Sequence, residues 1–306
     1  MLEFLTNFLS TTIVRATPML IAALGSLFIE RSGIINIGIE GLMLVGALMG
    51  VIGSYFTGSA VAGACVAMLS AAAFGLIFAF FTITLKANHV VSGLAINAIA
   101  SGFTILVRRL MFGLDGTVPK IATYQKIAIP VLSKLPVLGP TFFNQTALAY
   151  IALILVPVLT FVFKRTNIGL KVRSVGENPL ACDTLGINVV RVRYLCMIFG
   201  AMMAGLGGSF ISMGQMSFFS EGMIAGRGYM TLAAEVFGNY TPVGTFLACL
   251  VFGAADAAQY RLQAMSSAIP YHVWIMLPYL ITVTALCVYR NKSNAPASQG
   301  QSYVRN

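Results

Sequence analysis

The chain has 306 residues, of which 58% are hydrophobic and only 9% are charged, whereas soluble domains average about 25% charged residues. So much apolar surface cannot be buried inside one folded domain, so the composition excludes a soluble protein and predicts a polytopic protein in a lipid bilayer. The net charge of +10 does not indicate nucleic-acid binding, because the basic residues lie mostly between apolar runs, where they set membrane topology.

Apolar runs long enough to cross a bilayer as helices follow one another along the chain. We expect a span at each of the ranges 4–29, 34–54, 60–85, 89–111, 146–163, 194–213, 243–260 and 271–289. The range 229–240 is too short to cross alone and is expected to form a broken or tilted element. Counting it gives about nine crossings. The predicted fold is an all-α polytopic transmembrane bundle with one or two broken helices.

The charges between the spans predict the topology. Lys and Arg concentrate at cytoplasmic ends, so we place Arg31, Lys86 and the basic loop 164–193 in the cytoplasm, with the N-terminus outside. The proline-rich range 112–145 is then an extracytoplasmic loop with room for a short interfacial helix. This divides the chain into a transmembrane domain and a polar cytoplasmic tail, expected to be disordered, with the bounds 1–290 and 291–306.

The basic loop 164–193 contains the outline of one short helix. Asn178 is a favourable N-cap, because its side chain can accept from the free N–H groups of the first turn. Pro179 follows at the first helical position, and Gly186 supplies a left-handed end. Residues 179–185 would form a helix of roughly 10 Å. A short capped helix on a basic cytoplasmic loop predicts a contact with another protein.

Small residues at a spacing of four occur in two of the expected spans. Ala201 and Gly205 lie in the sixth span, and Gly46 and Gly50 lie in the second. Such pairs allow two helices to approach closely. The alternative is that they only fill space on the lipid side.

Polar residues inside the apolar runs are the candidates for a substrate pathway, and these are Asn36, Glu40, Ser92, Asn97, Glu235 and Asp256. Such groups are costly at membrane depth and usually face the bundle interior or a water-filled path. Asn36 and Glu40 are four residues apart, which predicts one shared helix face. The alternative is that they make hydrogen bonds between helices that only fix packing. Arg15, in the first span, is expected to snorkel or to face protein.

No arrangement of residues indicates an enzyme. The two histidines, His89 and His272, are far apart in sequence, and the chain has neither a CxxC pair nor a GxxxxGK[ST] phosphate loop. We therefore predict no catalytic residue, no metal site and no cofactor in this chain. If ATP is used, another chain must bind it.

Three segments resemble the permease subunits of bacterial ABC importers: ERSGIINIGIEGLMLVGA (30–47), GLKVRSVGENPLACDTLGI (169–187) and the range 226–263 that begins GRGYMTLAAEVFG. The branch includes ribose-type sugar, branched-chain amino acid and nucleoside systems, and the chain is most similar to the shorter permease of guanosine-type systems. The resemblance implies a discontinuous helix at 33–41. It also implies a coupling helix that contacts the ATPase through Gly176, Glu177, Asn178, Pro179, Leu180 and Gly186.

The same resemblance implies the partners and the location. These are a second homologous permease, an ABC ATPase with two nucleotide-binding modules that holds ATP and Mg²⁺, and an extracytoplasmic substrate-binding lipoprotein, all at the bacterial plasma membrane. The expected function is import of nucleosides by alternating access. The alternatives are simple sugars, branched-chain amino acids, or ion-coupled secondary transport through Glu40 or Asp256.

Overall fold

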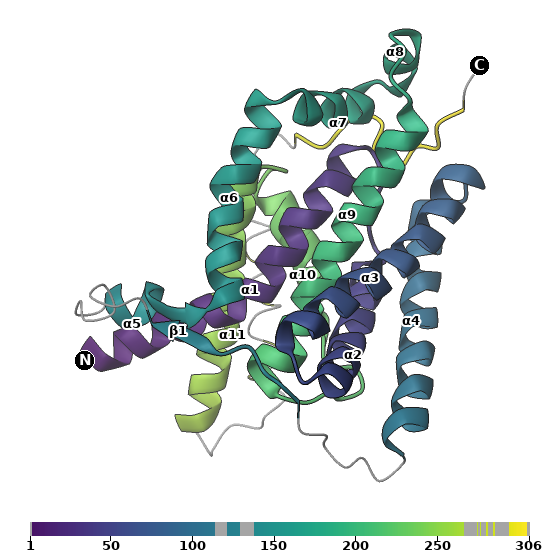
Figure 1. Ribbon diagram of the computed structural model, residues 1–306. Helices are drawn as coiled ribbons and strands as arrows, with labels where there is room; N and C mark the ends of the chain where they lie inside the picture. The colour runs from purple at the N-terminus through teal and green to yellow at the C-terminus, as the bar shows by residue number, and fades with distance from the viewer. Residues whose placement is uncertain are drawn as a thin grey trace.

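A computed structural model describes residues 2–113, 121–128, 138–265 and 294–304, together with residues 274, 276, 280 and 284. The expected span 271–289 therefore lies almost wholly outside the described residues. Within them the chain forms a helical bundle (Figure 1). The long helices are α1 (Leu2–Arg31), α2 (Ile39–Thr57), α3 (Ala60–Ala79), α4 (His89–Phe112), α6 (Ala147–Arg165), α9 (Val189–Phe210) and α11 (Pro242–Met265).

Seven helical segments of the described chain are long and apolar enough to cross a membrane. Two of them continue into a short π-helical turn, α3 through Phe80–Thr84 and α9 through Ile211–Met216. The range expected to be short forms α10 (Arg227–Phe237), which is not among the seven. The chain is therefore a multi-pass membrane protein.

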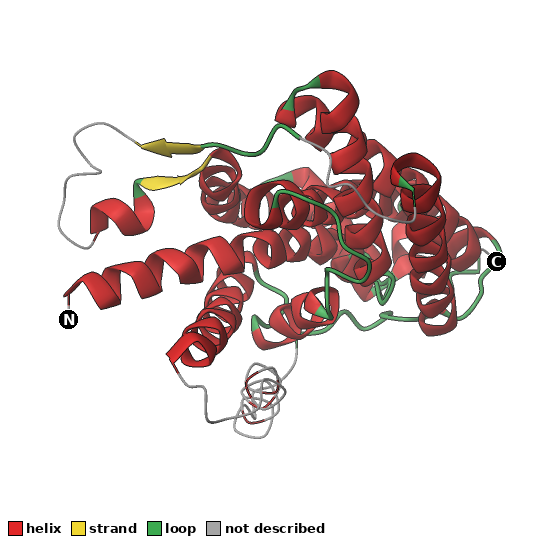
Figure 2. Ribbon diagram, turned by 90° about the horizontal axis from the view of Figure 1, so that it is seen from below, coloured by secondary structure: helices red, strands yellow, loops and turns green. Residues whose placement is uncertain are grey.

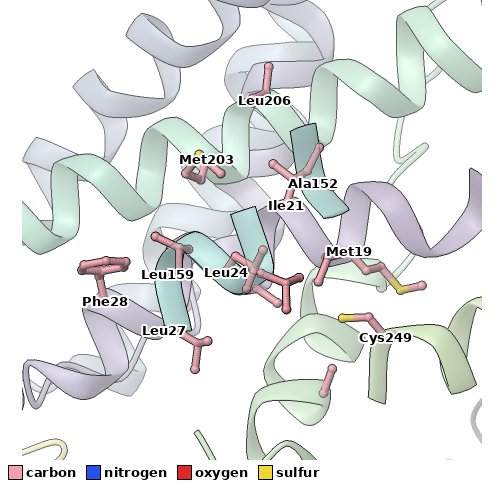
Figure 3. Close-up of a cluster of buried hydrophobic side chains, with 14 of the residues drawn as sticks. Met19, Ile21, Leu24, Leu27, Phe28, Ala152, Leu159, Met203, Leu206 and Cys249 are labelled. Atoms are coloured by element: carbon pink, nitrogen blue, oxygen red, sulfur yellow. The ribbon is translucent and has the colours of Figure 1, made fainter. Parts of the chain in front are cut away.

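The bundle is built around α1, with α9 beside it (Figure 1). The most apolar window of α1 is 89% buried, whereas that of α4 is only 28% buried. Figure 3 shows the core on α1, where Leu24 and Phe28 meet side chains from neighbouring helices. Helix α4 therefore lies at the edge of the bundle, with a broad face left for lipid or for another protein.

The small residues of α2 and α9 pack backbone against backbone, as the sequence predicts. A Cβ atom on Gly46 would lie 2.3 Å from the carbonyl oxygen of Gly205, and one on Gly50 would lie 2.9 Å from Cβ of Ser209. Neither position leaves room for a larger side chain, so these glycines allow the close contact between α2 and α9. The alternative, that they only fill space facing lipid, is wrong for this pair of helices.

The range 112–145 contains the short helix α5 (Leu138–Phe142) and two strands that the sequence does not predict. The strands β1 (Lys126–Ala128) and β2 (Asn144–Thr146) pair antiparallel, with Ile127 opposite Gln145. In both views this sheet lies beside the N-terminal half of α1 (Figures 1 and 2). The described residues are thus helical apart from this small sheet, which is an addition to the helical transmembrane bundle that the sequence predicts.

The described part of the polar tail, residues 294–304, is ordered, and the expectation of disorder is wrong there. Its backbone lies against the opposite end of the bundle from the sheet (Figure 1). Gly300 N–H donates to the carbonyl of Gly33 at 2.9 Å, and Ser298 N–H donates to that of Gly176 at 2.9 Å. The tail is held because it satisfies backbone groups that neighbouring helix ends leave unpaired.

Candidate functional site

The basic loop folds into two helices, α7 (Asn167–Glu177) and α8 (Pro179–Thr184). Helix α8 has the expected cap, because Oδ1 of Asn178 accepts from the N–H of Ala181 at 3.1 Å. Pro179 is the first helical residue, and Gly186 has φ +79°. The helix ends one residue before the predicted end, and α7 is an addition that the sequence does not predict.

Helix α8 carries apolar side chains on its outer surface. Leu180 is 50% exposed and Leu185, directly after the helix, is 79% exposed. Figure 1 shows α8 projecting beyond the ends of the long helices. The opposite surface is buried, since Cys182 packs against Val175 and Val189, and this burial raises the pKa of the Cys182 thiol. Exposed leucines on a projecting helix are typical of a docking site for another protein.

Gly176 and Glu177 do not share the exposed surface of α8. A Cβ atom on Gly176 would lie 2.1 Å from the carbonyl oxygen of Arg31, so α7 crosses the end of α1 in direct backbone contact. Oε2 of Glu177 accepts from the N–H of Ala297 at 3.3 Å. The six residues implied by the resemblance therefore fall into two groups. Asn178, Pro179, Leu180 and Gly186 shape or border α8, while Gly176 and Glu177 anchor α7.

A polar junction joins α2, α4 and α10. The two carboxylate oxygens of Glu40 accept from the N–H groups of Gly226 at 2.8 Å and Gly228 at 2.7 Å. Asn97 accepts from the N–H of Gly41 at 2.8 Å and donates to the Tyr229 hydroxyl at 3.0 Å. Because Tyr229 is 44% exposed, this junction can be reached from the edge of the bundle.

Asn36 lies elsewhere, and the expected helix face shared with Glu40 is wrong. The chain is not helical at 34–36, and α2 begins only at Ile39. Asn36 is fully buried; its N–H donates to Oε1 of Glu30 at 2.9 Å, and its side-chain amide donates to Ser26 at 3.3 Å. The break expected at 33–41 is present, and it is this break that turns the two side chains toward different neighbours.

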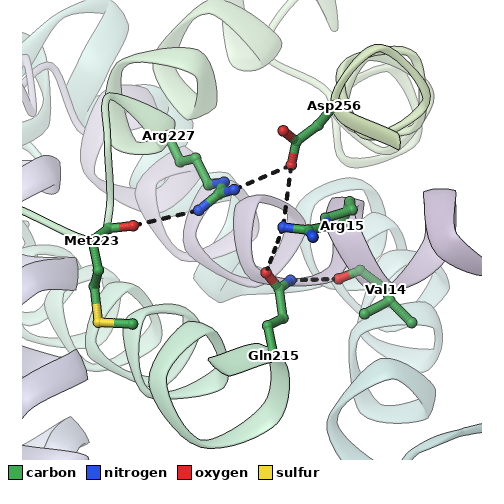
Figure 4. A network of polar contacts seen from close by, with 6 residues as sticks. All are labelled: Val14, Arg15, Gln215, Met223, Arg227 and Asp256. Carbon is green, nitrogen blue, oxygen red and sulfur yellow. Dashed lines mark hydrogen bonds and ion pairs between the residues drawn. The ribbon is translucent and has the colours of Figure 1, made fainter. Parts of the chain in front are cut away.

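Asp256 is enclosed by two arginines. Its Oδ2 lies 3.2 Å from Nη2 of Arg227 and 3.9 Å from Nη1 of Arg15. Arg15 also reaches the side-chain oxygen of Gln215 at 3.5 Å (Figure 4). Its guanidinium lies 3.8 Å from the ring centre of Tyr260. Arg15 thus faces protein, and Asp256 serves as the counter-charge that holds α1, α10 and α11 together.

The two remaining candidates are buried. Ser92 is 8% exposed on α4, and Glu235 is 1% exposed on α10. Within the described chain no group reaches the carboxylate oxygens of Glu235 in ordinary hydrogen-bond geometry, and the nearby Ser26 side chain interacts with them only weakly. Of the six candidate pathway residues, Glu40 and Asn97 meet at the junction, while Asn36 and Glu235 both lie beside Ser26 and Glu30. Tyr229 was missed, although it stands in the GRGYM segment used for the resemblance.

The bundle, the broken element α10 and the projecting α8 together define a membrane transport protein. The model of the family described as "Branched-chain amino acid transport system / permease component" matches residues 8–286. The chain belongs to this family and is a transport permease component.

Two relatives match over nearly the whole chain. The guanosine ABC transporter permease protein NupQ of Bacillus subtilis (strain 168) is 36% identical, covering 99% of this chain and 98% of that one. TsgC13 of Haloferax volcanii, provisionally named a glucose ABC transporter permease, is also 36% identical, covering 99% of both chains. An inward-facing structure, provisionally described as a metal-chelate type ABC transporter, shares the fold with a TM-score of 0.50. It is 14% identical in sequence, and the match covers 92% of this chain and 85% of that one.

Proposed function

We propose that this chain is the permease subunit of an ATP-driven ABC importer that carries nucleosides across a bacterial plasma membrane. The observation that carries the proposal is α8, a capped helix whose Leu180 and Leu185 are exposed at the basic end of the bundle. In this reading that end is cytoplasmic, and α8 docks on a separate ATPase with two nucleotide-binding modules. The loop 112–145 then faces outward.

A second, homologous permease would complete the pathway. Helix α4 has the least buried window of the seven spans, and the Glu40, Asn97 and Tyr229 junction opens on this side. We place the partner permease there, with the junction along the path between the two chains. The described spans, the range 271–289 and the broken element α10 would together give the nine expected crossings.

The transport step needs no covalent chemistry. ATP binding would close the ATPase modules and displace α8 as a rigid body, and the spans would reorient from one open side to the other. A nucleoside is neutral and rich in donors and acceptors, so the Asn97 amide and the Tyr229 hydroxyl suit its passage. Tight binding would slow release, so high affinity belongs to the extracytoplasmic lipoprotein.

A sugar is the strongest alternative cargo, because one relative is provisionally named for glucose and because the same junction suits any neutral hydroxyl-rich solute. Ion coupling is less favoured. Glu40 already accepts two backbone hydrogen bonds, and Asp256 already neutralises arginine.

The test is uptake by the whole complex, co-expressed with the second permease, the ATPase and the lipoprotein and placed in proteoliposomes. We expect ATP-dependent guanosine uptake that glucose, ribose and leucine do not compete away. Competition by glucose or ribose would show that the substrate is a sugar. Uptake without any ATPase would show that the protein is not part of an ATP-driven importer.

The docking surface is tested by Leu180→Asp together with Leu185→Asp, which should release the ATPase during purification. The control is Ile127→Asp, also 50% exposed but on β1 at the other end of the molecule. Asn178→Gly with Pro179→Gly should leave membrane insertion intact and abolish uptake. Normal uptake in both α8 variants would exclude α8 as the coupling helix.

A further inference from the structure

The C-terminal segment 294–304 lies at the α7–α8 end of the bundle (Figure 1). On α7 it contacts one carbonyl twice, since both N–H and Oγ of Ser298 donate to the oxygen of Gly176, at 2.9 and 2.6 Å. Ser298 is buried. Gly176 is also the residue that touches the carbonyl of Arg31, so the tail is fixed where α7 crosses α1.

The same segment is tied to the break after α1. The side-chain amide of Gln299 donates to Oε2 of the buried Glu30, and Gly300 donates to Gly33. Arg193 of α9 joins the tail to the segment after α1, because its guanidinium donates to the carbonyls of Ser32 at 3.1 Å and Gln301 at 3.2 Å. The tail is therefore bound to α1 and α9 as well as to α7.

The end of the tail reaches the buried side of α8. Tyr303 packs on the cluster formed by Val175, Cys182 and Val189, and with Asp183 and Asn188 it lines a cavity of about 280 Å³. A helix of six residues is not stable alone, so packing must fix the direction of α8. Tyr303 supplies part of this packing from a segment that is also bonded to α1.

We infer that residues 294–304 are a positioning element of the transport cycle: Tyr303 supports α8 from behind, and Ser298 and Gln299 link that support to α7 and α1. This inference rests on the proposed function. When the ATPase displaces α8, the tail makes the ends of α1 and α9 move with it. Without the tail, α8 could still dock on the ATPase, but its movement would no longer be passed on to α1 and α9.

The experiment uses the complete complex and measures three quantities: ATPase retained on purification, ATP hydrolysed, and guanosine transported per ATP. The variants are deletion of residues 294–306, Tyr303→Ala and Ser298→Ala, with Tyr303→Phe as the conservative replacement. The matched control is Gln301→Ala, because Gln301 forms its hydrogen bonds to Arg193 and Ser298 through its backbone. Comparison with the unaltered complex separates the two proposals, since a wild type without ATP-driven uptake would refute the proposed function itself.

We expect the deletion and Tyr303→Ala to retain the ATPase and its hydrolysis while transport per ATP falls about tenfold, within the usual range of coupling between sites. Tyr303→Phe and Gln301→Ala should stay close to wild type. Unchanged transport per ATP in the deletion would overturn the inference. Loss of the ATPase or of folded protein in Tyr303→Ala would also overturn it, since the tail would then serve assembly alone.

A second readout follows the support of α8 directly. With Cys65, Cys196, Cys249 and Cys287 replaced by Ser, a water-soluble maleimide reports only on the buried Cys182. Tyr303→Ala should speed its labelling, and Gln301→Ala should not. Equal labelling rates in the two variants would show that Tyr303 does not cover α8 and would overturn the inference.

Discussion

The acidic side chains at the two ends of helix α10 differ in their bonding partners. At its start, Glu40 accepts two backbone N–H groups and Asp256 is paired with Arg227. Near its other end, Glu235 is buried with no cation among the described residues, and the Ser26 side chain is the polar group that interacts with it. The acidic side chains at the start of α10 are therefore fixed by backbone N–H groups and by arginine, whereas at the far end the arginine, Arg31, donates to the carbonyl of Tyr240 at 2.9 Å and not to Glu235.

The backbone is in the left-handed conformation directly before and after α10. Ala225 and Gly226 have φ of 52° and 78° before the helix, and Asn239 and Tyr240 have φ of 52° and 53° after it. Left-handed residues other than glycine are costly and persist only when surroundings hold them. Helix α10 thus lies between two sharp turns, and the two turns are held by contacts with other segments of the chain.

Of the substitutions around α10, Arg227→Met should lower the stability of the protein most. Asp256 would keep only Arg15 at 3.9 Å, and removing one partner of a buried ion pair costs about 3–5 kcal/mol. The measurement is the thermal unfolding midpoint of the purified protein in detergent, which we expect to fall. Adding Asp256→Asn should recover much of the loss.

The control for this prediction is Arg108→Met, because the pair between Arg108 and Glu221 is more exposed. A pair of that kind contributes up to about 1 kcal/mol. If Arg227→Met were no worse than Arg108→Met, the start of α10 would not depend on charge pairing.

Glu40→Gln should have an intermediate effect, about 1–3 kcal/mol. The amide keeps one acceptor oxygen for two donors, and its NH₂ group would point at the N–H of Gly226 or Gly228. Unfolding midpoint and uptake are measured together. Reduced uptake by a stably folded variant would assign Glu40 to the pathway, and a lower midpoint with normal uptake per folded molecule would assign it to packing.

Glu235→Gln should have the smallest effect, with a change in stability under about 1 kcal/mol, because Glu235 makes no described ion pair and the amide keeps an oxygen for the Ser26 side chain. The neutral amide also has no charge to bury. A loss as large as that of Glu40→Gln, again read from the unfolding midpoint, would show that the contact with Ser26 matters as much as the two backbone hydrogen bonds of Glu40.

The spans and α8 were predictable because their signals are local. An apolar run of sufficient length indicates a membrane helix, and Asn178, Pro179 and Gly186 mark the limits of α8 by chemistry that acts within a few residues. The close contact at Gly46 was also predictable from spacing. These features do not depend on which distant segment comes to lie nearby.

The errors arose where distant segments meet. The shared face of Asn36 and Glu40 assumed a continuous helix, but the backbone breaks between them and Glu30 binds the Asn36 N–H. The tail was expected to be disordered from its polar composition, yet that polarity supplies donors to Gly176 and Gly33. The small sheet pairs residues such as Ile127 and Gln145, whose strands are too short to show a pattern.

The course of the tail also bears on how this protein is handled at the bench. Tyr303 packs on the cluster behind α8, so an affinity tag or fluorescent protein joined soon after Tyr303 would begin near the surface that we assign to the ATPase. A tag joined ahead of α1 would instead lie on the side of the small sheet, away from α7 and α8. Loss of activity on C-terminal fusion would therefore point to obstruction at α8 before it points to misfolding.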